Sequence, residues 1–562
     1  MTSSHGFDAR ATTPDGESAF GVDAPSAAAV GRGSESAGYS TFAAALAGLL
    51  AAAIAAVLGV IALLTGVSGG DIAAAVYRVD LFRHVGFALW DNGWYAGHWT
   101  LNYSVLFGPI GTALGIPLTD VACAAIAAWA FDRLVTPRFG RVGHLAAAVF
   151  AVGTLVQVAS GRVPFLLGQA IALLALLAAV RRIWPPALLL AAVAAMCSPL
   201  AGAFLALAAF AWLVADLPLR NRGRGALVAV ALIPVVAPEL LFPGQGTMPF
   251  STLDFVAMFV PVCVLGMLLD ASQRTLRIGA GVYGFAVLGC YLVPSAIGVN
   301  ITRLGTSVGL SVMLCVLPAL TVRGRWSLKV PARIWGARAL FAAAVVSLAL
   351  SEWVPAAGAL LGSSNPSSSK AYFNPLLGYL IPHDRPLGRV EVVPTATHWE
   401  AVYVAPRLPL ARGWERQLDT ADNPIFYQPG QLDAKSYRAW LEDNGVRFVA
   451  LANAPLDYVA GPEARLVRAG VPGLKLAWRN ANWRVYSVLG VAGIVSGAGK
   501  IVREQGSTVV LDASRRGSLL VRIHYSANWG VRSGHASLRE GPGGWLTVSA
   551  QRPGRIVLAI GL

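Results

Sequence analysis

Residues 70–108 read GDIAAAVYRVDLFRHVGFALWDNGWYAGHWTLNYSVLFG, and this stretch decides how the rest of the chain is organised. It is too polar to cross a bilayer and too rich in aromatic side chains to be a plain linker. Its carboxylates, imidazoles and aromatic rings include Asp71, Asp80, Asp91, His84, His98, Trp90, Trp94, Tyr95 and Trp99. Because hydrophobic runs lie on both sides, we expect an outer loop over 67–102 to carry the chemistry.

The composition is that of an integral membrane protein. Of the 562 residues, 56% are hydrophobic and only 13% are charged, whereas soluble domains have roughly a quarter of charged residues. In a soluble protein the net charge of +15 would suggest a nucleic-acid partner. Here many basic residues lie in short loops between hydrophobic runs, where the positive-inside rule accounts for them. We therefore expect the lipid bilayer, and no nucleic acid, as a partner.

Hydropathy predicts a multispan membrane domain over 41–358 with about eleven helical spans. The spans are expected at 41–66, 117–135, 143–160, 164–180, 184–198, 200–216, 224–241, 252–270, 277–296, 301–321 and 334–355. The pair around Cys197-Ser198-Pro199 could instead be one kinked span. Residues 1–40 are rich in Ser, Gly and Ala without hydrophobic periodicity, which predicts a disordered cytoplasmic tail.

Basic residues fall in every second loop, which predicts the orientation in the bacterial plasma membrane. They follow the even-numbered spans: Arg133, Arg138, Arg141, Arg181, Arg182, Arg220, Arg222, Arg224, Arg274, Arg277, Arg323, Arg325, Lys329, Arg333 and Arg338. The short loops in between offer only Arg162 and Arg303. The pattern places the N-terminus in the cytoplasm, and the outer loop and everything after residue 356 outside.

The composition changes at a linker, GSSNPSSS at 362–369, after which two exported domains are expected. Residues 370–490 predict an α/β domain with strands at 390–404, 446–451, 475–478 and 483–488 and helices at 433–444 and 463–469. Residues 491–562 predict a β-sandwich with strands near 508–513, 518–524, 535–538, 545–549 and 555–560. The expected fold class is a polytopic α-helical membrane domain followed by an exported α/β region and a terminal β-sandwich.

Asp80 and His84 are four residues apart, so on a helix they share one face. The rest of this segment is half apolar, as expected for a helix that lies along a membrane surface. A partly desolvated carboxylate there can act as a general base or as a metal ligand. The alternative is a solvated interfacial helix on which Asp80 caps the helix or pairs with Arg83 or His84.

Three further groups each have a functional and a structural interpretation. The aromatic run Trp90–Trp99 could stack on the apolar face of a pyranose, or it could anchor the loop at the membrane interface. Arg162 and Arg303 could grip a lipid-linked phosphate, or they could snorkel to lipid headgroups. Trp399 and Trp414, each beside charged residues, could line a glycan groove or pack in the exported domain.

The motifs in this loop resemble those of a known superfamily. They are Asp80-Leu-Phe-Arg-His84, Leu89-Trp-Asp-Asn-Gly-Trp-Tyr95 and Asn102-Tyr-Ser-Val-Leu-Phe-Gly-Pro109. With the preceding span they resemble bacterial GT-C proteins, multispan glycosyltransferases that use polyprenyl-phosphate sugars. The chain looks nearest to the membrane proteins described as 6-pyruvoyl-tetrahydropterin synthase-related, a description that implies no pterin chemistry here. Ser160–Gly168 is also similar to that family, and Arg407–Asp419 is similar to the outer domain of its large actinobacterial members.

The resemblance implies a GT-C-like glycosyltransferase that moves a sugar from a polyprenyl-phosphate donor to a cell-envelope glycan or lipid acceptor. In that family the first outer loop carries one or two acidic residues as base or metal ligands. We therefore expect Asp80 to be the base, with His84 and Asp91 orienting groups, or Asp80 and Asp91 to bind Mg²⁺ or Mn²⁺. The family pattern has adjacent acidic residues, whereas the aspartates at 71, 80 and 91 stand apart, so the resemblance alone assigns neither base nor metal.

Aromatic residues and arginines are the expected substrate-binding groups, and two other function classes stay open. The expected substrate-binding residues are Trp90, Trp94, Tyr95, His98, Arg162, Arg303, Trp399 and Trp414. The two arginines would hold the donor phosphate, and the exported domain would hold the acceptor. The alternatives are a transporter or lipid-linked glycan flippase, and a non-catalytic envelope scaffold. The spans show no obvious internal repeat and few charges inside the membrane, which argues against transport.

Overall fold

The computed structural model describes residues 48–67, 69–217, 222–244, 246–269, 271–322, 331–361 and 365–561. The expected cytoplasmic tail, residues 1–40, and part of the expected linker lie outside these ranges. The described residues before 362 are mainly helical, and strands prevail from residue 474 onward. The chain is therefore a helical protein with a β-rich C-terminal region.

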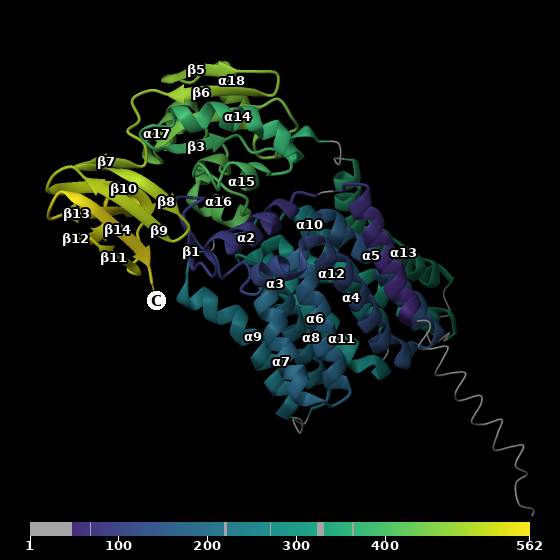
Figure 1. Cartoon of the computed structure of the whole chain (residues 1–562). Helices are drawn as coiled ribbons and strands as arrows, with labels where there is room; N and C mark the ends of the chain where they lie inside the picture. The colour runs from purple at the N-terminus through teal and green to yellow at the C-terminus, as the bar shows by residue number, and fades with distance from the viewer. Residues whose placement is uncertain are drawn as a thin grey trace, which may run out of the picture. The chain divides into compact units, whose positions relative to one another are not determined.

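Each segment predicted to span the membrane contains a helix among its described residues, and these helices lie in one bundle (Figure 1). They are Gly48–Leu64, α4 (Ile116–Phe139), α5 (Arg141–Ser160), α6 (Val163–Val180), α7 (Trp184–Cys197), α8 (Pro199–Ala215), α9 (Arg222–Leu241), α10 (Thr252–Leu268), α11 (Arg274–Leu292), α12 (Thr302–Val322) and α13 (Pro331–Leu361). The α7–α8 pair is two helices, because Ser198 between them is extended and its side chain caps α8 at the N–H of Ala201.

Six helices in the described part of the chain are long and apolar enough to cross a membrane. They are Arg141–Ser160, Val163–Val180, Arg222–Leu241, Ala271–Leu292, Gly298–Leu317 and Arg338–Ala359. A seventh results if α3 (Phe107–Leu114) and α4, which are bent by 105° relative to each other, form one span. Gly48–Leu64, α7, α8 and α10 are apolar but shorter. Length and composition thus support six or seven crossing helices, fewer than the number of hydrophobic segments.

The predicted outer loop has its own secondary structure. It begins with α2 (Ile72–Val85), continues through a hairpin of β1 (Trp90–Asp91) and β2 (His98–Trp99), and ends at α3. The helix expected from the spacing of Asp80 and His84 is present in α2. The alanines of its first turn are fully buried, so the start of α2 packs inside the protein.

Residues 370–488 contain a four-stranded mixed sheet in the order β3-β4-β6-β5. β3 (Arg389–Val392) runs parallel to β4 (Val446–Ala452), and β5 (Leu474–Arg479) and β6 (Trp483–Val488) form the predicted hairpin. The accompanying helices are α14 (Lys370–His383), α15 (Glu400–Tyr403), α16 (Arg416–Asp422), α17 (Ala434–Asp443) and α18 (Gly461–Ala469). The predicted helices at 433–444 and 463–469 are confirmed as α17 and α18.

The long strand predicted at 390–404 is wrong beyond Val392. The backbone N–H and the hydroxyl of Thr395 donate to the Glu400 carboxylate at 3.1 and 2.6 Å. His398 adopts a φ of +53°, which turns the chain into α15. Local side-chain hydrogen bonds of this kind compete with extended structure, and the apolar pattern of the segment does not reveal them.

Residues 495–560 form the predicted β-sandwich from two four-stranded antiparallel sheets (Figure 1). Their orders are β12-β13-β10-β7 and β11-β14-β9-β8. The strands are β7 (Val495–Gly497), β8 (Gly499–Gln505), β9 (Thr508–Ala513), β10 (Gly517–His524), β11 (Trp529–Ser533), β12 (Ala536–Glu540), β13 (Trp545–Ala550) and β14 (Gly554–Ile560). All the predicted strands are present, and β7, β8 and β11 are additional.

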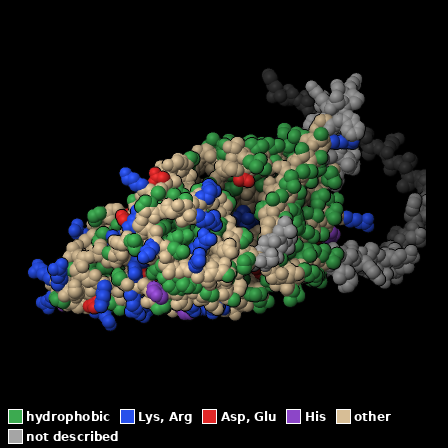
Figure 2. All heavy atoms as spheres, turned by 90° about the horizontal axis from the view of Figure 1, so that it is seen from above, with side chains coloured by type: hydrophobic (Ala, Val, Ile, Leu, Met, Phe, Trp, Pro, Cys, Tyr) green, Lys and Arg blue, Asp and Glu red, His purple; other side chains and the backbone are tan. Residues whose placement is uncertain are grey.

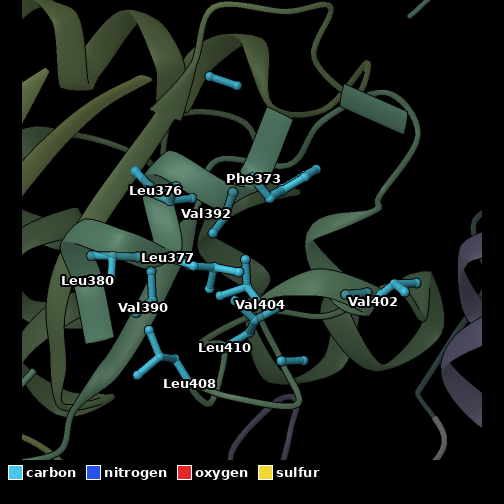
Figure 3. Packing of buried hydrophobic residues seen from close by; sticks show 14 of the residues in the cluster. Phe373, Leu376, Leu377, Leu380, Val390, Val392, Val402, Val404, Leu408 and Leu410 are labelled. Carbon is cyan, nitrogen blue, oxygen red and sulfur yellow. The ribbon is translucent and has the colours of Figure 1, made fainter. Parts of the chain in front are cut away.

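The predicted outer loop and the C-terminal region share one hydrophobic core. Figure 3 shows the part of this core built from α14, β3 and the following residues, including Phe373, Leu376, Leu377, Val390 and Val392. The loop contributes Ala73, Tyr77, Trp94 and Tyr95 to the same cluster. The loop is therefore held in place by C-terminal residues more than 270 positions away in the sequence.

Large exposed hydrophobic side chains are frequent on the helices. Leu240, Leu253 and Phe285, for example, are 75%, 79% and 78% exposed. In Figure 2 hydrophobic side chains dominate the side of the molecule that carries the bundle, and Lys and Arg side chains gather toward the other end. An apolar surface of this extent fits a lipid environment better than water.

Candidate functional site

Three helix starts meet at the beginning of α2. Asp71 occupies the N-cap position of α2, but its side chain accepts no capping hydrogen bond. Its Oδ2 lies 3.2 Å from Nε of Arg162, the residue before α6, and 3.4 Å from Nη2 of Arg303, near the start of α12. The structure thus brings together the two arginines selected from the sequence, on a carboxylate that the sequence analysis did not select.

This arginine site, formed by Asp71, Arg162 and Arg303, has an excess of positive charge. Two guanidinium groups face one carboxylate, and the side chains of both arginines are 21% exposed. A guanidinium can donate two parallel hydrogen bonds to a phosphate. An anion could therefore bind to the two arginines, either together with the Asp71 carboxylate or in its place.

Aromatic side chains from separate segments surround the arginine site. The indole of Trp414 donates a hydrogen bond to the backbone oxygen of Gly70 at 2.8 Å, and the Tyr103 ring meets Trp414 edge-on at 6.3 Å between centroids. Burial raises the pKa of the Tyr103 hydroxyl, so this phenol stays protonated. The Arg303 guanidinium lies 5.8 Å from the centre of the Phe165 ring. The C-terminal region thus reaches the start of α2 through Trp414.

An apolar cavity of about 710 Å³ lies among α4, α6, α8, α10, α11 and α12. Phe165 and Leu304 line it next to the arginine site, whereas Arg138 lines it at the end of α4. Arg138 precedes α5 and Arg162 follows it, so the length of α5 approximates the distance between them. This helix has 20 residues and is therefore about 30 Å long. The cavity has the length and the apolar lining to take a hydrocarbon chain.

A second cleft, of about 490 Å³, lies beside the later turns of α2, and we call it the α2 cleft. The three predicted catalytic residues, Asp80, His84 and Asp91, all line it. The C-terminal region contributes Lys370, Tyr403, Arg407 and Glu504 to its lining. Residues that were selected from the sequence for catalysis therefore lie around one cavity.

The surroundings of Asp80 fit both interpretations given above, a solvated ion pair on the helix surface and a functional carboxylate. Its side chain is 36% exposed and its Oδ1 lies 3.3 Å from Nη1 of Arg83, so the predicted surface ion pair exists. His84 Nδ1 lies 2.7 Å from the backbone oxygen of Asp80 rather than from its carboxylate. At the same time Asp80 faces the α2 cleft, where a general base or a binding group would have to lie.

Two buried carboxyl groups also line the α2 cleft. Asp91 accepts hydrogen bonds from the Tyr77 hydroxyl at 2.7 Å and from the backbone N–H of Gly93 at 3.2 Å. Burial raises the pKa of Asp91 despite these donors. Burial also raises the pKa of Glu504 to about 7, although Nη2 of Arg389 lies 3.8 Å from its carboxylate. Both groups therefore stay protonated at a higher pH than an exposed carboxyl group does.

The two predicted metal ligands, Asp80 and Asp91, line the same cleft. Among the residues that the structure describes, no group of three or more His, Cys, Asp or Glu side chains could hold a metal ion. The expected Mg²⁺ or Mn²⁺ stays a prediction, and no step proposed below depends on a metal.

The loop residues expected to stack on a sugar are buried. Trp94 has no exposed surface and stacks on Tyr77 at 4.2 Å and on His98 at 5.6 Å between centroids. Tyr95 and His98 are 1% and 3% exposed, and Trp90 belongs to the core of the sandwich. The placement of these four residues is that of packing residues.

Sequence analysis missed a buried ionic centre on α2. Arg78 forms an ion pair with Glu415, and their side chains are only 7% and 6% exposed. Nη2 of Arg78 also lies 3.0 Å from Nε2 of His98. Burial, and next the charge of Arg78, lower the pKa of His98, so the imidazole is neutral. The one available signal was an arginine that directly follows an apolar, Ala-rich run, and nothing local pointed to Glu415.

The two tryptophans selected in the C-terminal region lie at different sites. Trp414 lies at the arginine site through its hydrogen bond to Gly70. Trp399 stacks on Tyr403 at 5.3 Å between centroids, and Tyr403 lines the α2 cleft. Trp399 thus contacts a residue that lines the α2 cleft.

Fold and site together define a class of protein. The described residues form a helical bundle, with six or seven helices that could cross a membrane, joined to a β-rich C-terminal region. A comparison with protein-family models finds no match, and a search of curated proteins finds no matching sequence. The function is therefore inferred from the arginine site, the apolar cavity and the α2 cleft.

Proposed function

We propose that this protein is a GT-C-like glycosyltransferase of the bacterial plasma membrane. It moves a sugar from a polyprenyl-phosphate donor to a cell-envelope glycan or lipid acceptor. The observation that carries the proposal is the convergence of Arg162 and Arg303 on Asp71 beside an apolar cavity. A lipid-linked phosphate needs both features, cations for its head and apolar volume for its chain.

The proposal includes about eleven helices across the membrane, with the shorter apolar helices among them. Basic residues alternate between helix ends, so the N-terminus is cytoplasmic and the outer loop and the C-terminal region lie outside. A cysteine in place of Gln428 should react with an impermeant thiol reagent in intact cells, and one in place of Arg222 should not. Labelling at 222 alone would reverse the orientation and remove the proposal of an outer active site.

In the proposed step, the acceptor hydroxyl oxygen attacks the anomeric carbon of the donor sugar. The bond from this carbon to the phosphate oxygen breaks, and the leaving polyprenyl phosphate keeps the electron pair. Arg162 and Arg303 stabilise the charge of the leaving phosphate. A carboxylate takes the proton of the acceptor hydroxyl.

Asp71 and Asp80 are the two candidates for this carboxylate. The sequence favours Asp80, but the two positions are nine residues apart, which is about 13 Å along α2 and more than the width of one sugar ring. Because the attacked carbon is bonded to the phosphate oxygen, the base has to lie close to the arginine site. Asp71 is therefore the better placed base, and Asp80, His84 and Asp91 would hold the acceptor in the α2 cleft.

The test is transfer by the purified protein, in neutral detergent, from a panel of radiolabelled polyprenyl-phosphate sugars to envelope acceptors. At least one donor should yield labelled acceptor and free polyprenyl phosphate. Arg162→Gln and Arg303→Gln should impair the use of this donor, whereas Arg479→Gln on an exposed strand should not. If no donor is consumed, the glycosyltransferase proposal is wrong.

A lipid-linked glycan flippase is the second candidate, and the extent of the cavity favours it. The lining runs from Phe165 beside the arginine site to Arg138 at the far end of α4. In reconstituted vesicles, a flippase would move a labelled lipid-linked glycan between leaflets without breaking the bond to phosphate. Movement without sugar transfer would replace the enzyme proposal, and transfer without movement would exclude the flippase.

A further inference from the structure

One end of the β-sandwich is strongly basic. The pairs Gly554–Ala513 and Gly517–Ala550 show that the turns 514–516 and 551–553 lie side by side at this end. The exposed basic residues on these turns and the adjoining strands are Lys500, Arg515, Arg516, Arg552 and Arg555. We call this group the basic end. The turn between β8 and β9, where Gly506 accepts hydrogen bonds from Asn92, lies at the opposite end of the sandwich.

The positive charge of the basic end is almost uncompensated. Its one carboxylate, Asp512, lies 4.0 Å from Lys500 and is paired across the strands with Arg555. Within the described chain, no carboxylate lies within ion-pair distance of Arg515, Arg516 or Arg552. Five basic groups and one acidic group give a formal charge of +4. Blue side chains project from the sandwich end of the molecule in Figure 2.

Membrane topology does not account for this charge. The positive-inside rule concerns short loops next to membrane spans, whereas the sandwich begins more than 130 residues after α13. Residues 491–562 nevertheless contain nine Lys or Arg and only three Asp or Glu. Neighbouring like charges repel one another, so an anionic partner would stabilise this end of the sandwich.

We propose that the basic end binds a linear polyanion, a polymer with repeated phosphodiester or carboxylate charges. Adjacent strands lie about 5 Å apart and the two sheets about 10 Å apart, so the neighbouring turns carry several guanidinium groups that one polymer with successive charges can reach. A single small anion would contact only some of them. Proteins that bind membrane surfaces usually add large apolar side chains to such a cluster, and the turns 514–516 and 551–553 contain none. The proposal does not depend on the transferase function.

The experiment uses the full chain in nanodiscs of zwitterionic lipid and measures its binding to immobilised polymers. The probes are long-chain polyphosphate and polygalacturonate, and neutral dextran is the control polymer. We expect binding to at least one polyanion and none to dextran, with an affinity that falls as salt rises. The triple variant Arg515→Glu, Arg516→Glu, Arg552→Glu should bind about tenfold more weakly or worse. Its melting temperature should not fall, because all three side chains are exposed and their mutual repulsion is removed.

A matched variant separates a defined surface from general net charge. Arg465→Glu, Arg468→Glu and Lys475→Glu change the same charge at exposed positions of α18 and β5, and this variant should bind like the wild type. Equal losses in the two variants, or no loss in the first, would overturn the proposal. Binding to anionic-lipid vesicles but to neither polymer would also overturn it, because the partner would then be a membrane. Binding to only one of the two polyanions would identify the partner as phosphodiester-based or carboxylate-based.

Discussion

Nε of Arg162 lies 3.2 Å from Oδ2 of Asp71, although 91 residues separate them in the chain. Arg303 approaches the same oxygen at 3.4 Å, from a third helix. One carboxylate thus holds two cations that would otherwise repel each other. An anion that enters this site also neutralises Arg162 and Arg303. The Asp71 carboxylate is then released from its ion pairs when the proposed donor binds.

Removing one cation of the arginine site should weaken donor binding. Arg303→Gln should raise the KM for the donor by about tenfold or more, because a charge-assisted, two-point contact to phosphate is lost. Arg303→Lys keeps the charge without the forked geometry and should lie between the wild type and the Gln variant. Steady-state kinetics with varied donor measures this, and an unchanged KM in the Gln variant would remove Arg303 from the donor site.

The two candidate bases predict different kinetic losses. Asp71→Asn should lower kcat by about a hundredfold or more, the scale expected when a general base is lost. The donor should still bind, since the same variant removes a competitor for the arginines. Asp80→Asn should mainly raise the KM for the acceptor. If instead Asp80→Asn abolishes turnover while Asp71→Asn is active, the base is Asp80, as the sequence suggests.

The buried pair of Arg78 and Glu415 should show non-additive stability effects. Arg78→Met leaves the Glu415 carboxylate buried without its partner and should destabilise the protein by about 3–5 kcal/mol. Glu415→Gln should have a similar effect, because it leaves the Arg78 guanidinium buried without its carboxylate. The double variant should cost less than the sum of the two single variants, because no uncompensated charge remains. Denaturant unfolding in detergent measures this, and strictly additive losses would show that the two side chains do not interact.

Glu504 should make stability depend on pH. Burial raises its pKa to about 7 from an ordinary value of 4.5, so between these values the folded chain binds more protons than the unfolded chain. The stabilisation is complete below pH 4.5 and is lost as the pH rises through about 7, with a total on the order of 3 kcal/mol. The difference in melting temperature between wild type and Glu504→Gln, measured from pH 4 to 8, should follow this titration. A pH-independent difference would show that Glu504 titrates normally.

The sequence predicts separate exported domains from residue 370 onward, and the core shared with the predicted outer loop changes this expectation. Tyr77, Trp94 and Tyr95 of the predicted outer loop belong to the same buried cluster as residues of α14 and β3. Without the loop, these C-terminal residues would be exposed as an apolar patch. Residues 365–562 expressed alone should therefore aggregate or elute as oligomers in size-exclusion chromatography. A monomer with one cooperative unfolding transition would show that the loop is dispensable for this core.

Local patterns in the sequence were sufficient to predict the helices and most strands. Hydrophobic runs fold as helices, the helix expected at 433–444 begins after the cap Asp433, and the alternation at 475–488 gives the β5–β6 hairpin. These features depend on residues that are close in the chain, so periodicity and capping residues reveal them. The strand expected at 390–404 was wrong because the carboxylate of Glu400 holds Thr395 in a turn, which periodicity does not record.

Only the tertiary structure decided which predicted residues lie together and which are buried. The sequence marked Arg162 and Arg303 separately, and packing of α2, α6 and α12 placed both on Asp71. The sequence also marked the rings of Trp94 and Tyr95 for sugar binding, and packing against the C-terminal region buried them. These outcomes depend on contacts across tens to hundreds of residues. Burial and pairing of this kind are set by how the elements pack, and no local pattern carries that information.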